Sequence, residues 1–179
     1  MKNYFKNLEL LSKNHVYSPE MEHDACGVGL IASTEGKKSR SVVEHGIEAL
    51  KAVWHRGAVD ADGKTGDGAG IHLEIPKDFF IEKIQVTGHQ HDDSEICVGM
   101  IFLPRNDYSS QESCKTIVES ALTKNNFSIY GWRQVPVNPK VLGEKAFQTM
   151  PEIIQVLFKS NDPNLLDKDL ERKIYETRK

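Results

Sequence analysis

The chain has 179 residues, of which 39% are hydrophobic and 27% are charged, and its formal net charge is −3. This composition fits one folded domain with a sizeable apolar core. The weak negative charge gives no basic footprint for nucleic acid and no polybasic patch for a membrane surface, and no apolar run is long enough to span a bilayer. We therefore expect neither nucleic acid nor a membrane as a partner.

The three cysteines, Cys26, Cys97 and Cys114, are widely spaced and form no C-x-x-C pair. This spacing is unlike that of a disulfide framework or a zinc ribbon, and it suits a reducing compartment. The first residues have no uninterrupted apolar segment of the kind that a signal peptide needs. We therefore expect a cytoplasmic protein, with a plastid as the open alternative.

The first half of the chain predicts two strands and a helix after a leader. Residues 1–25 are expected to be a leader with at most one helical turn at 5–11. Strands are predicted at residues 28–32 and 71–75. Between them, apolar residues at helical spacing predict a helix that starts with a capping box of Ser41 and Glu44 and ends near Gly57.

The second half predicts alternating strands and helices. Pro76 is expected to open a short helix, and residues 87–94 to form a polar loop. Apolar patterning then predicts strands at 96–103, 127–137 and 153–158, a helix at 111–124, and a final helix begun by Asp162-Pro163. Strands and helices in mixed order predict an α+β fold with a sheet covered by helices.

A metal site is the first candidate to consider. His89, His91, Asp92, Asp93 and Cys97 all carry groups that can bind metals. A polar loop with two histidines needs further ligands at suitable spacing, and no matching fourth ligand follows downstream. We therefore predict a solvated loop and no metal.

Cys26 lies just before the apolar run at 28–32, next to Gly27, where a ligand can approach the backbone closely. It is either a nucleophile or a buried free cysteine. A thiol is mostly protonated at neutral pH, so a nucleophile needs a base. If residues 1–25 are removed, the free α-amino group of Cys26, with a pKa of roughly 7.7 to 8.0, can accept the thiol proton.

The segment Gly66-Asp67-Gly68-Ala69-Gly70 lacks the lysine and hydroxyl of a phosphate-binding P-loop and precedes a predicted strand. We expect tight turns there, with backbone exposed near a site. Arg56, at the end of the predicted helix, either complements the helix dipole, pairs with a carboxylate or braces a catalytic loop. The residues alone leave these alternatives open.

Three blocks occur in an order that carries a resemblance: Ala25-Cys26-Gly27-Val28-Gly29-Leu30-Ile31-Ala32, then His55-Arg56-Gly57-Ala58, then Ala61-Asp62-Gly63-Lys64-Thr65-Gly66-Asp67-Gly68-Ala69-Gly70. Residues 131–137, 142–143 and 151–155 agree with them. Together they resemble the glutamate synthase large subunit family, at its N-terminal class II glutamine amidotransferase domain.

The resemblance implies the four-layer αββα sandwich of N-terminal nucleophile hydrolases, here incomplete at the C-terminus. It implies a propeptide at 1–25 and a partial amidotransferase domain at 26–179. Cys26 would attack glutamine, form a γ-glutamyl thioester and release ammonia. Arg56 would brace the nucleophile loop, and Gly27, Asp67 and Gly68 would bind substrate or support the site.

For the full-length protein, the resemblance implies a synthase domain in the same chain, with FMN and an iron–sulfur cluster, that forms glutamate from 2-oxoglutarate. It also implies ferredoxin or a small electron-donating subunit as a partner. No cofactor is expected in these 179 residues. The family's oxyanion and glutamine-clamping residues are expected further along. The alternatives are a catalytically inert fragment and a standalone amidotransferase subunit that serves another acceptor.

Overall fold

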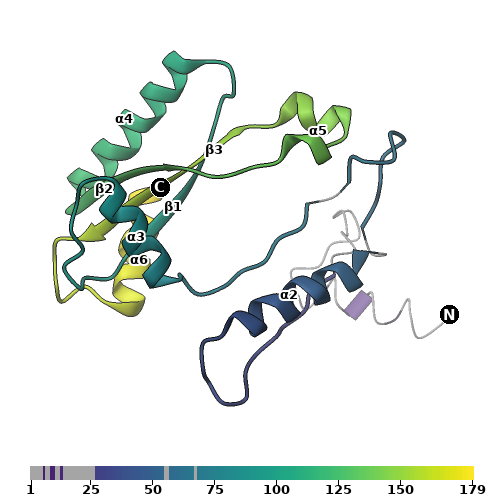
Figure 1. Cartoon of the computed structure of the whole chain (residues 1–179), viewed down its shortest axis with the longest axis horizontal. Helices are drawn as coiled ribbons and strands as arrows, with labels where there is room; N and C mark the ends of the chain where they lie inside the picture. The colour runs from purple at the N-terminus through teal and green to yellow at the C-terminus, as the bar shows by residue number, and fades with distance from the viewer. Residues whose placement is uncertain (1–5, 7–8, 11–12, 14–26, 55–56, 67) are drawn as a thin grey trace. The chain divides into compact units, whose positions relative to one another are not determined.

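The structure is a computed structural model that describes residues 6, 9–10, 13, 27–54, 57–66 and 68–179. The chain divides into two compact units, one of residues 1–58 and 67–71 and the other of residues 59–66 and 72–179 (Figure 1). Most of the predicted leader, together with Cys26, Arg56 and Asp67, lies outside the described residues. No helix in the described ranges is both long and apolar enough to cross a membrane.

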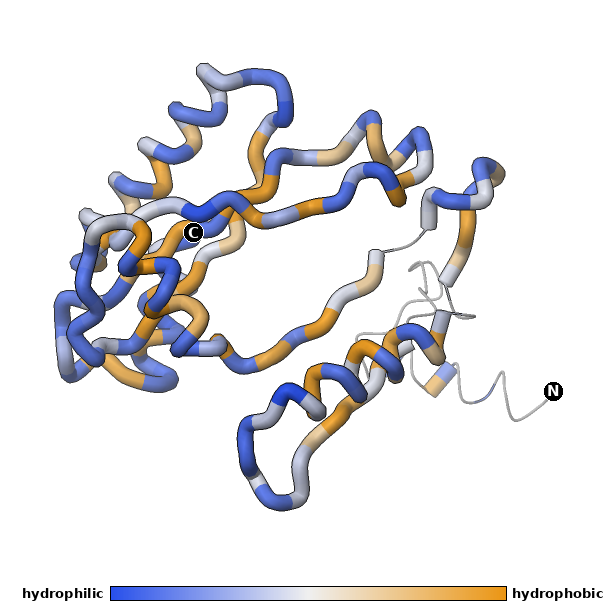
Figure 2. Tube along the Cα trace, in the orientation of Figure 1, coloured by the Kyte–Doolittle hydropathy of each residue, from blue (hydrophilic) through white to orange (hydrophobic). Residues whose placement is uncertain are grey.

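The first unit contains the predicted helix, α2, which runs over Arg40–Ala52. Apolar residues recur along it, as Figure 2 shows, because every third or fourth position repeats one face of a helix. The predicted capping box is wrong. The N-cap is Ser39, whose hydroxyl pairs with that of Ser41 at 2.7 Å, and Glu44 instead accepts a hydrogen bond from Arg40 at 3.2 Å.

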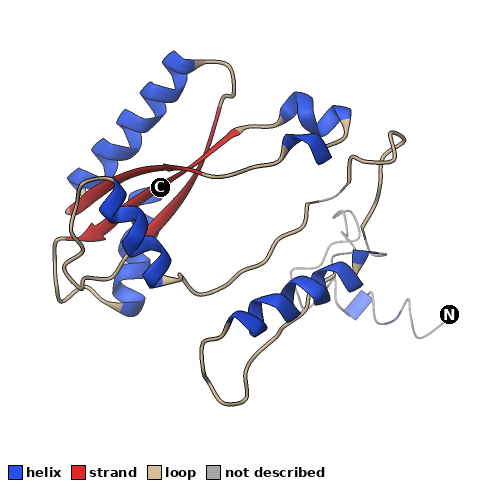
Figure 3. Ribbon diagram, viewed as in Figure 1, coloured by secondary structure: helices blue, strands red, loops and turns tan. Residues whose placement is uncertain are grey.

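The two strands predicted at 28–32 and 71–75 are also wrong, because both segments are irregular in the structure (Figure 3). Val28 is 91% exposed and Leu30 is 90% exposed. A strand needs a neighbour for its backbone hydrogen bonds and a packed face for its apolar side chains. Within the described part of the chain, neither segment pairs with another strand.

The second unit is built on a three-stranded antiparallel sheet. Its strands are β1 (Cys97–Leu103), β2 (Phe127–Gln134) and β3 (Glu152–Ser160), in the order β1-β3-β2. Cys97 lies opposite Phe158 in the ladder between β1 and β3, and the ladder between β2 and β3 shifts register between Ile129 and Gly131. The three predicted strands are confirmed.

Helices pack on both faces of this sheet. Helix α3 spans Lys77–Val86, α4 spans Tyr108–Lys124 and α6 spans Asp167–Arg178. Two core clusters separate the faces. Leu122 and Leu170, from α4 and α6, pack with Cys97, Phe127, Val156 and Phe158 of the strands, while Phe80 and Ile84, from α3, pack with Ile96, Tyr130 and Leu157. The side chains of β3 therefore alternate between the two clusters.

The last helix starts later than predicted. Asp162 accepts a hydrogen bond from the Asn164 amide through its side chain at 2.9 Å, and its carbonyl accepts one from Leu165 at 3.2 Å. These bonds close a separate turn, so Asp162 does not cap α6, whose N-cap is Leu166. Two short elements were not predicted: a 3₁₀ helix at Pro139–Val141 and helix α5 at Glu144–Thr149.

The α+β class is confirmed. The described residues form a helix–sheet–helix arrangement in the second unit and a single long helix in the first. The sandwich implied by the resemblance has two sheets. The residues that the structure describes form one three-stranded sheet.

Candidate functional site

Gly27 and Gly68 are the two predicted site residues that the structure describes, and both are exposed. A side chain added at Gly68 would meet no atom within 4 Å, so the backbone there is open on the side where a Cβ would lie. The exposed backbone expected for the glycine-rich segment is therefore present at Gly68. Cys26, Arg56 and Asp67 stay predictions.

The segment that follows Gly68 lies against helix α2 within the first unit. A methyl group at Gly46, on α2, would come within 2.9 Å of the Ile71 Cδ1 atom. Glycine at position 46 thus leaves room for the Ile71 side chain to lie this close to the helix. The structure thus groups the Gly27 segment, α2 and the end of the glycine-rich segment in one unit.

Helix α2 ends just before the position of Arg56. Its last residue is Ala52, and Val53 forms the cap through its backbone amide. The Gly57 amide then donates to the Trp54 carbonyl at 2.9 Å, which turns the chain sharply. The helix end predicted near Gly57 is five residues later than Ala52, where α2 ends.

The loop at 59–66, in the second unit, is closed by its own hydrogen bonds. The Asp60 amide donates to the Thr65 carbonyl at 2.7 Å, and Val59 and Gly66 form an isolated antiparallel bridge. The Asp62 carboxylate accepts from the Lys64 amide at 2.9 Å, and from the amide and hydroxyl of Thr65 at 2.7 and 2.6 Å. These hydrogen bonds therefore fix the conformation of residues 59–66 within the loop itself.

These donors change the acidity of Asp62. The hydrogen bond from the Thr65 hydroxyl is the largest cause, and with the Lys64 and Thr65 amides it lowers the pKa of the Asp62 carboxyl to about 2. Hydrogen bonds to the ionised form stabilise that form. Asp62 therefore stays negatively charged throughout the physiological range.

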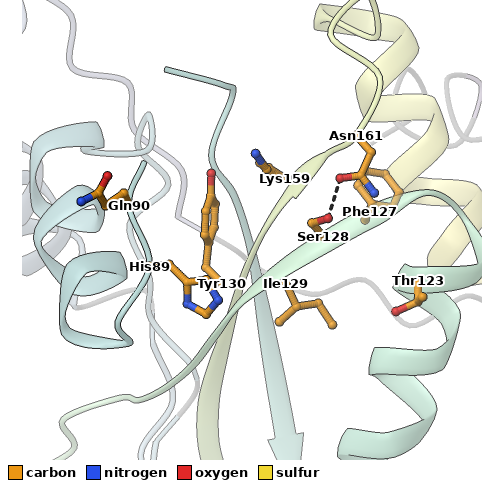
Figure 4. A pocket seen from close by; sticks show the side chains of 9 residues that line it. All are labelled: His89, Gln90, Thr123, Phe127, Ser128, Ile129, Tyr130, Lys159 and Asn161. Carbon is orange, nitrogen blue, oxygen red and sulfur yellow. Dashed lines mark hydrogen bonds between the residues drawn. The ribbon is translucent and has the colours of Figure 1, made fainter. Parts of the chain in front are cut away.

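A separate cavity of about 490 Å³ opens at the outer edge of β2 (Figure 4). Neither Gly27 nor Gly68, the predicted site residues that the structure describes, lines this cavity. The residues that line it come from α4, β2, the end of β3 and the loop before β1: His89, Gln90, Thr123, Phe127, Ser128, Ile129, Tyr130, Lys159 and Asn161. The Ser128 hydroxyl donates to the Asn161 side-chain oxygen at 2.5 Å across one side of it.

The charged groups at this cavity neutralise one another. Lys159 forms an ion pair with Asp92, which also accepts from the Ser94 hydroxyl at 2.6 Å and from the Tyr130 hydroxyl at 3.3 Å. The Lys159 hydrogen bond, above all, holds the pKa of Asp92 well below its usual range. The same bond raises the pKa of Lys159, and burial raises that of Tyr130.

Several of the residues considered as metal ligands make other contacts in the structure. One ring nitrogen of His91 pairs with the Ser94 carbonyl at 2.9 Å, and Asp92 is paired with Lys159. Cys97 is buried in the core, where desolvation raises the pKa of its thiol to about 12. In the described ranges, no group of three or more metal-binding side chains is placed to hold an ion.

A family model described as "Glutamine amidotransferases class-II" matches residues 26–179. The glutamate synthase [NADPH] large chain of Azospirillum brasilense is 53% identical over 173 residues, which are 97% of this chain. Ferredoxin-dependent glutamate synthase 1 of Arabidopsis thaliana is 40% identical over 88% of the chain, and glutamate synthase [NADH] of Saccharomyces cerevisiae is 37% identical over 81%.

The matched region is a small part of each relative. It covers 11% of the Azospirillum protein, 10% of the Arabidopsis protein and 7% of the yeast protein. The family match, in contrast, spans most of the present chain and begins at Cys26, the residue singled out as a nucleophile. The chain belongs to the class-II glutamine amidotransferase family.

Proposed function

We propose that this chain is the N-terminal part of the amidotransferase domain of a glutamate synthase, which hydrolyses glutamine and supplies ammonia for reductive formation of glutamate from 2-oxoglutarate. The observation that carries this proposal is the family match that begins at Cys26. The three relatives described above are all glutamate synthases, which supports the acceptor reaction. They differ in electron donor, which this chain does not specify.

In this proposal residues 1–25 are a propeptide and residues 26–179 are part of the amidotransferase domain. Removal of the propeptide makes Cys26 the first residue. Its α-amino group takes the thiol proton, and the thiolate attacks the side-chain carbonyl of glutamine. Ammonia leaves with a proton from that amine, and a γ-glutamyl thioester remains. Water then breaks the thioester, which releases glutamate and restores the thiol.

The remaining site residues support this reaction by shaping the site and holding the substrate or the nucleophile in place. Gly27 leaves room beside the nucleophile, and Arg56 braces the loop that carries it. Asp67 and Gly68 bind glutamine or support the site, and the open backbone at Gly68 supports this role because a ligand can reach it. These four roles are proposals that follow from the family pattern.

The cofactors of the proposed reaction belong to the rest of the longer protein. An iron–sulfur cluster is held by cysteine thiolates that lie close together, whereas the three cysteines of this chain are widely spaced and Cys97 lies in the core. The residues present therefore do not fit a cluster, and we place both it and FMN in the synthase domain. Ferredoxin or a small electron-donating subunit is the proposed partner, and the cytosol or a plastid the proposed location.

Substitution of Cys26 tests the function directly. In the full-length protein that contains this chain, we expect Cys26→Ala to abolish release of glutamate from glutamine, because no other group replaces the nucleophile. Glutamate formation with ammonium supplied in place of glutamine should persist, since that route bypasses the thioester.

Cys114→Ala is the matched control, because Cys114 is a partly buried thiol on α4. We expect this variant to hydrolyse glutamine as the unsubstituted protein does. Glutamine hydrolysis that survives in Cys26→Ala, or an unsubstituted protein that does not hydrolyse glutamine, would contradict the proposal.

A further inference from the structure

The sheet of the second unit contains one complete split β-α-β unit and the beginning of another. Strands β1 and β2 both run antiparallel to β3, which lies between them (Figure 3). They are therefore parallel to each other, and α4 connects them across β3. The same pattern starts again with β3 and α6. A strand after α6 that runs parallel to β3 would complete it.

The face that the helices cover indicates where such a strand would lie. Leu122 of α4 and Leu170 of α6 belong to one core cluster, so both helices cover the same face of the sheet. Crossover connections between parallel strands are right-handed in about 98% of cases. Because β3 runs opposite to β1 while its helix covers the same face, this handedness moves the chain in the opposite direction across the sheet. A strand after α6 is therefore expected beside β1.

Helix α6 already lies on the β1 side of the sheet. It packs in the cluster that contains Cys97, the first residue of β1. Burial is the largest cause that raises the pKa of the Cys97 thiol, and the charges of Glu95 and of Glu171, which is on α6, add to it. Helix α4 is tied to β2 instead, because the Trp132 indole donates to Glu119 at 2.7 Å. Each helix thus lies where its crossover needs it.

The outer edge of β1 has a row of backbone groups that do not face β3. The Val135 amide donates to the Ile153 carbonyl at 3.1 Å, so the backbone of Ile153 faces β2. Backbone direction alternates along a strand, so the residues of β3 on either side of Ile153, and every second residue from them, face β1. Their partners on β1 are Cys97, Gly99, Ile101 and Leu103. The amides and carbonyls of Val98, Met100 and Phe102 therefore point away from the sheet.

This edge has none of the features that commonly protect the edge of a sheet. Strand β1 contains no charged residue and no proline, and its ladder with β3 is regular. Met100 is 46% exposed and Phe102 is 63% exposed. The other edge strand, β2, has a bulge before Gly131, whose φ is +149°. A bulge interrupts regular pairing, so β1 is the edge that suits a further strand.

We propose that the strand that follows α6 in the longer protein pairs antiparallel with β1, which makes β1 an internal strand of a four-stranded sheet. Its backbone would bond to Val98, Met100 and Phe102, and its side chains would cover part of the last two. We expect this strand to be mainly apolar, because β1 offers no charge to pair with. From the proposed function, the inference rests only on the continuation of the chain in a longer protein.

Photochemical crosslinking in the full-length protein identifies the neighbour of β1. Replacement of Phe102 by p-benzoylphenylalanine keeps an aromatic side chain at an exposed position. A short connection and one strand take up about 15 residues, so irradiation should join position 102 to the first 15 or so residues after Lys179 of the same chain. The same replacement of Ile117, which is 68% exposed on α4, is the matched control and should not give this link.

Amide hydrogen exchange in the unsubstituted full-length protein tests the pairing itself. The amides of Val98, Met100 and Phe102 should exchange within about tenfold of those of Gly99 and Ile101, whereas an open edge would make them about 100-fold faster. Along β2 the same alternation directs the amides of Trp132 and Gln134 outward. These two should stay about 100-fold faster than that of Arg133, because β2 remains an edge strand.

Three results would overturn the proposal: a link from position 102 to a second copy of the chain, a link to a segment elsewhere in the longer protein, or fast exchange at Val98, Met100 and Phe102. Slow exchange at Trp132 and Gln134 would contradict the strand order. If position 102 forms no link, the exchange rates decide between a paired and an open edge. None of these readouts depends on glutamine hydrolysis, so failure of the proposed chemistry would be seen separately.

Discussion

The Asp62 carboxylate accepts three hydrogen bonds from residues that follow it within the same loop. They lower its pKa to about 2, below the value of about 3.9 expected in an unfolded chain. A lowered pKa means that the folded state favours the ionised form. The resulting contribution to stability is fully present above about pH 4, and it is lost as the pH falls through about 2.

Titration of the Asp62 carboxyl group tests this assignment. We expect its ¹³C chemical shift to have a midpoint near pH 2 in the present chain. In Thr65→Val the midpoint should rise toward 3.8, because the hydroxyl that contributes most to the lowered pKa is gone.

Thr116→Val provides the control for that titration. The Thr116 hydroxyl donates to the Glu112 carbonyl at 2.9 Å on α4, so its removal is chemically matched but leaves Asp62 untouched. The Asp62 midpoint should stay near 2 in this variant. A midpoint near 3.8 in the unsubstituted chain would show that the loop does not hold the carboxylate as described.

At the scale of the elements, the bulge in β2 is sensitive to substitution. Gly131 has a φ of +149°, which side-chain-bearing residues rarely adopt. A Cβ there would also lie 2.9 Å from the Thr87 Cγ2 atom at the end of α3. The register shift of β2 therefore depends both on backbone freedom and on close packing with α3.

Gly131→Ala should lower the free energy of unfolding by about 1–3 kcal/mol, as measured by urea denaturation of the chain. Adding Thr87→Ser removes the methyl group that the new Cβ meets, but it leaves the backbone strain. The double variant should therefore recover only part of the loss. Unchanged stability in Gly131→Ala would mean that the bulge does not have this geometry.

Apolar patterning predicts the three strands of the sheet and helices α3 and α4, because these elements bury their patterned faces against one another. Leu157, in the central strand, is 0% exposed. The same patterning fails at 28–32, where Val28 and Leu30 have no packed face. It also misses α5, which is six residues long and has a glycine, Gly143, at its N-cap with no side chain to cap it.

At the scale of the whole molecule, the sequence predicts the proposed nucleophile but not the contact between the loop at 59–66 and Gly143. Cys26 belongs to a contiguous motif, and the family match also begins at this residue, while its role as the nucleophile stays a prediction. The contact of Asp62 and Thr65 with Gly143 joins segments far apart in the chain, and no local pattern reports it. Only the Asp62–Thr65 spacing, typical of a side chain that folds its own turn, indicates half of that contact.

The cysteines differ enough in environment to identify the nucleophile by labelling. Burial raises the pKa of the Cys97 thiol to about 12, so almost none of it is thiolate at neutral pH. A nucleophilic Cys26, in contrast, has its own amine as a base once residues 1–25 are gone. An electrophilic analogue of glutamine should therefore react at one position.

The most direct test is mass spectrometry of the full-length protein after treatment with a diazoketone analogue of glutamine. The account predicts a chain that begins at Cys26, carries one adduct on that residue, and is protected from the analogue by excess glutamine. An adduct on Cys97 or Cys114, or a protein that hydrolyses glutamine while residues 1–25 are still attached, would contradict it.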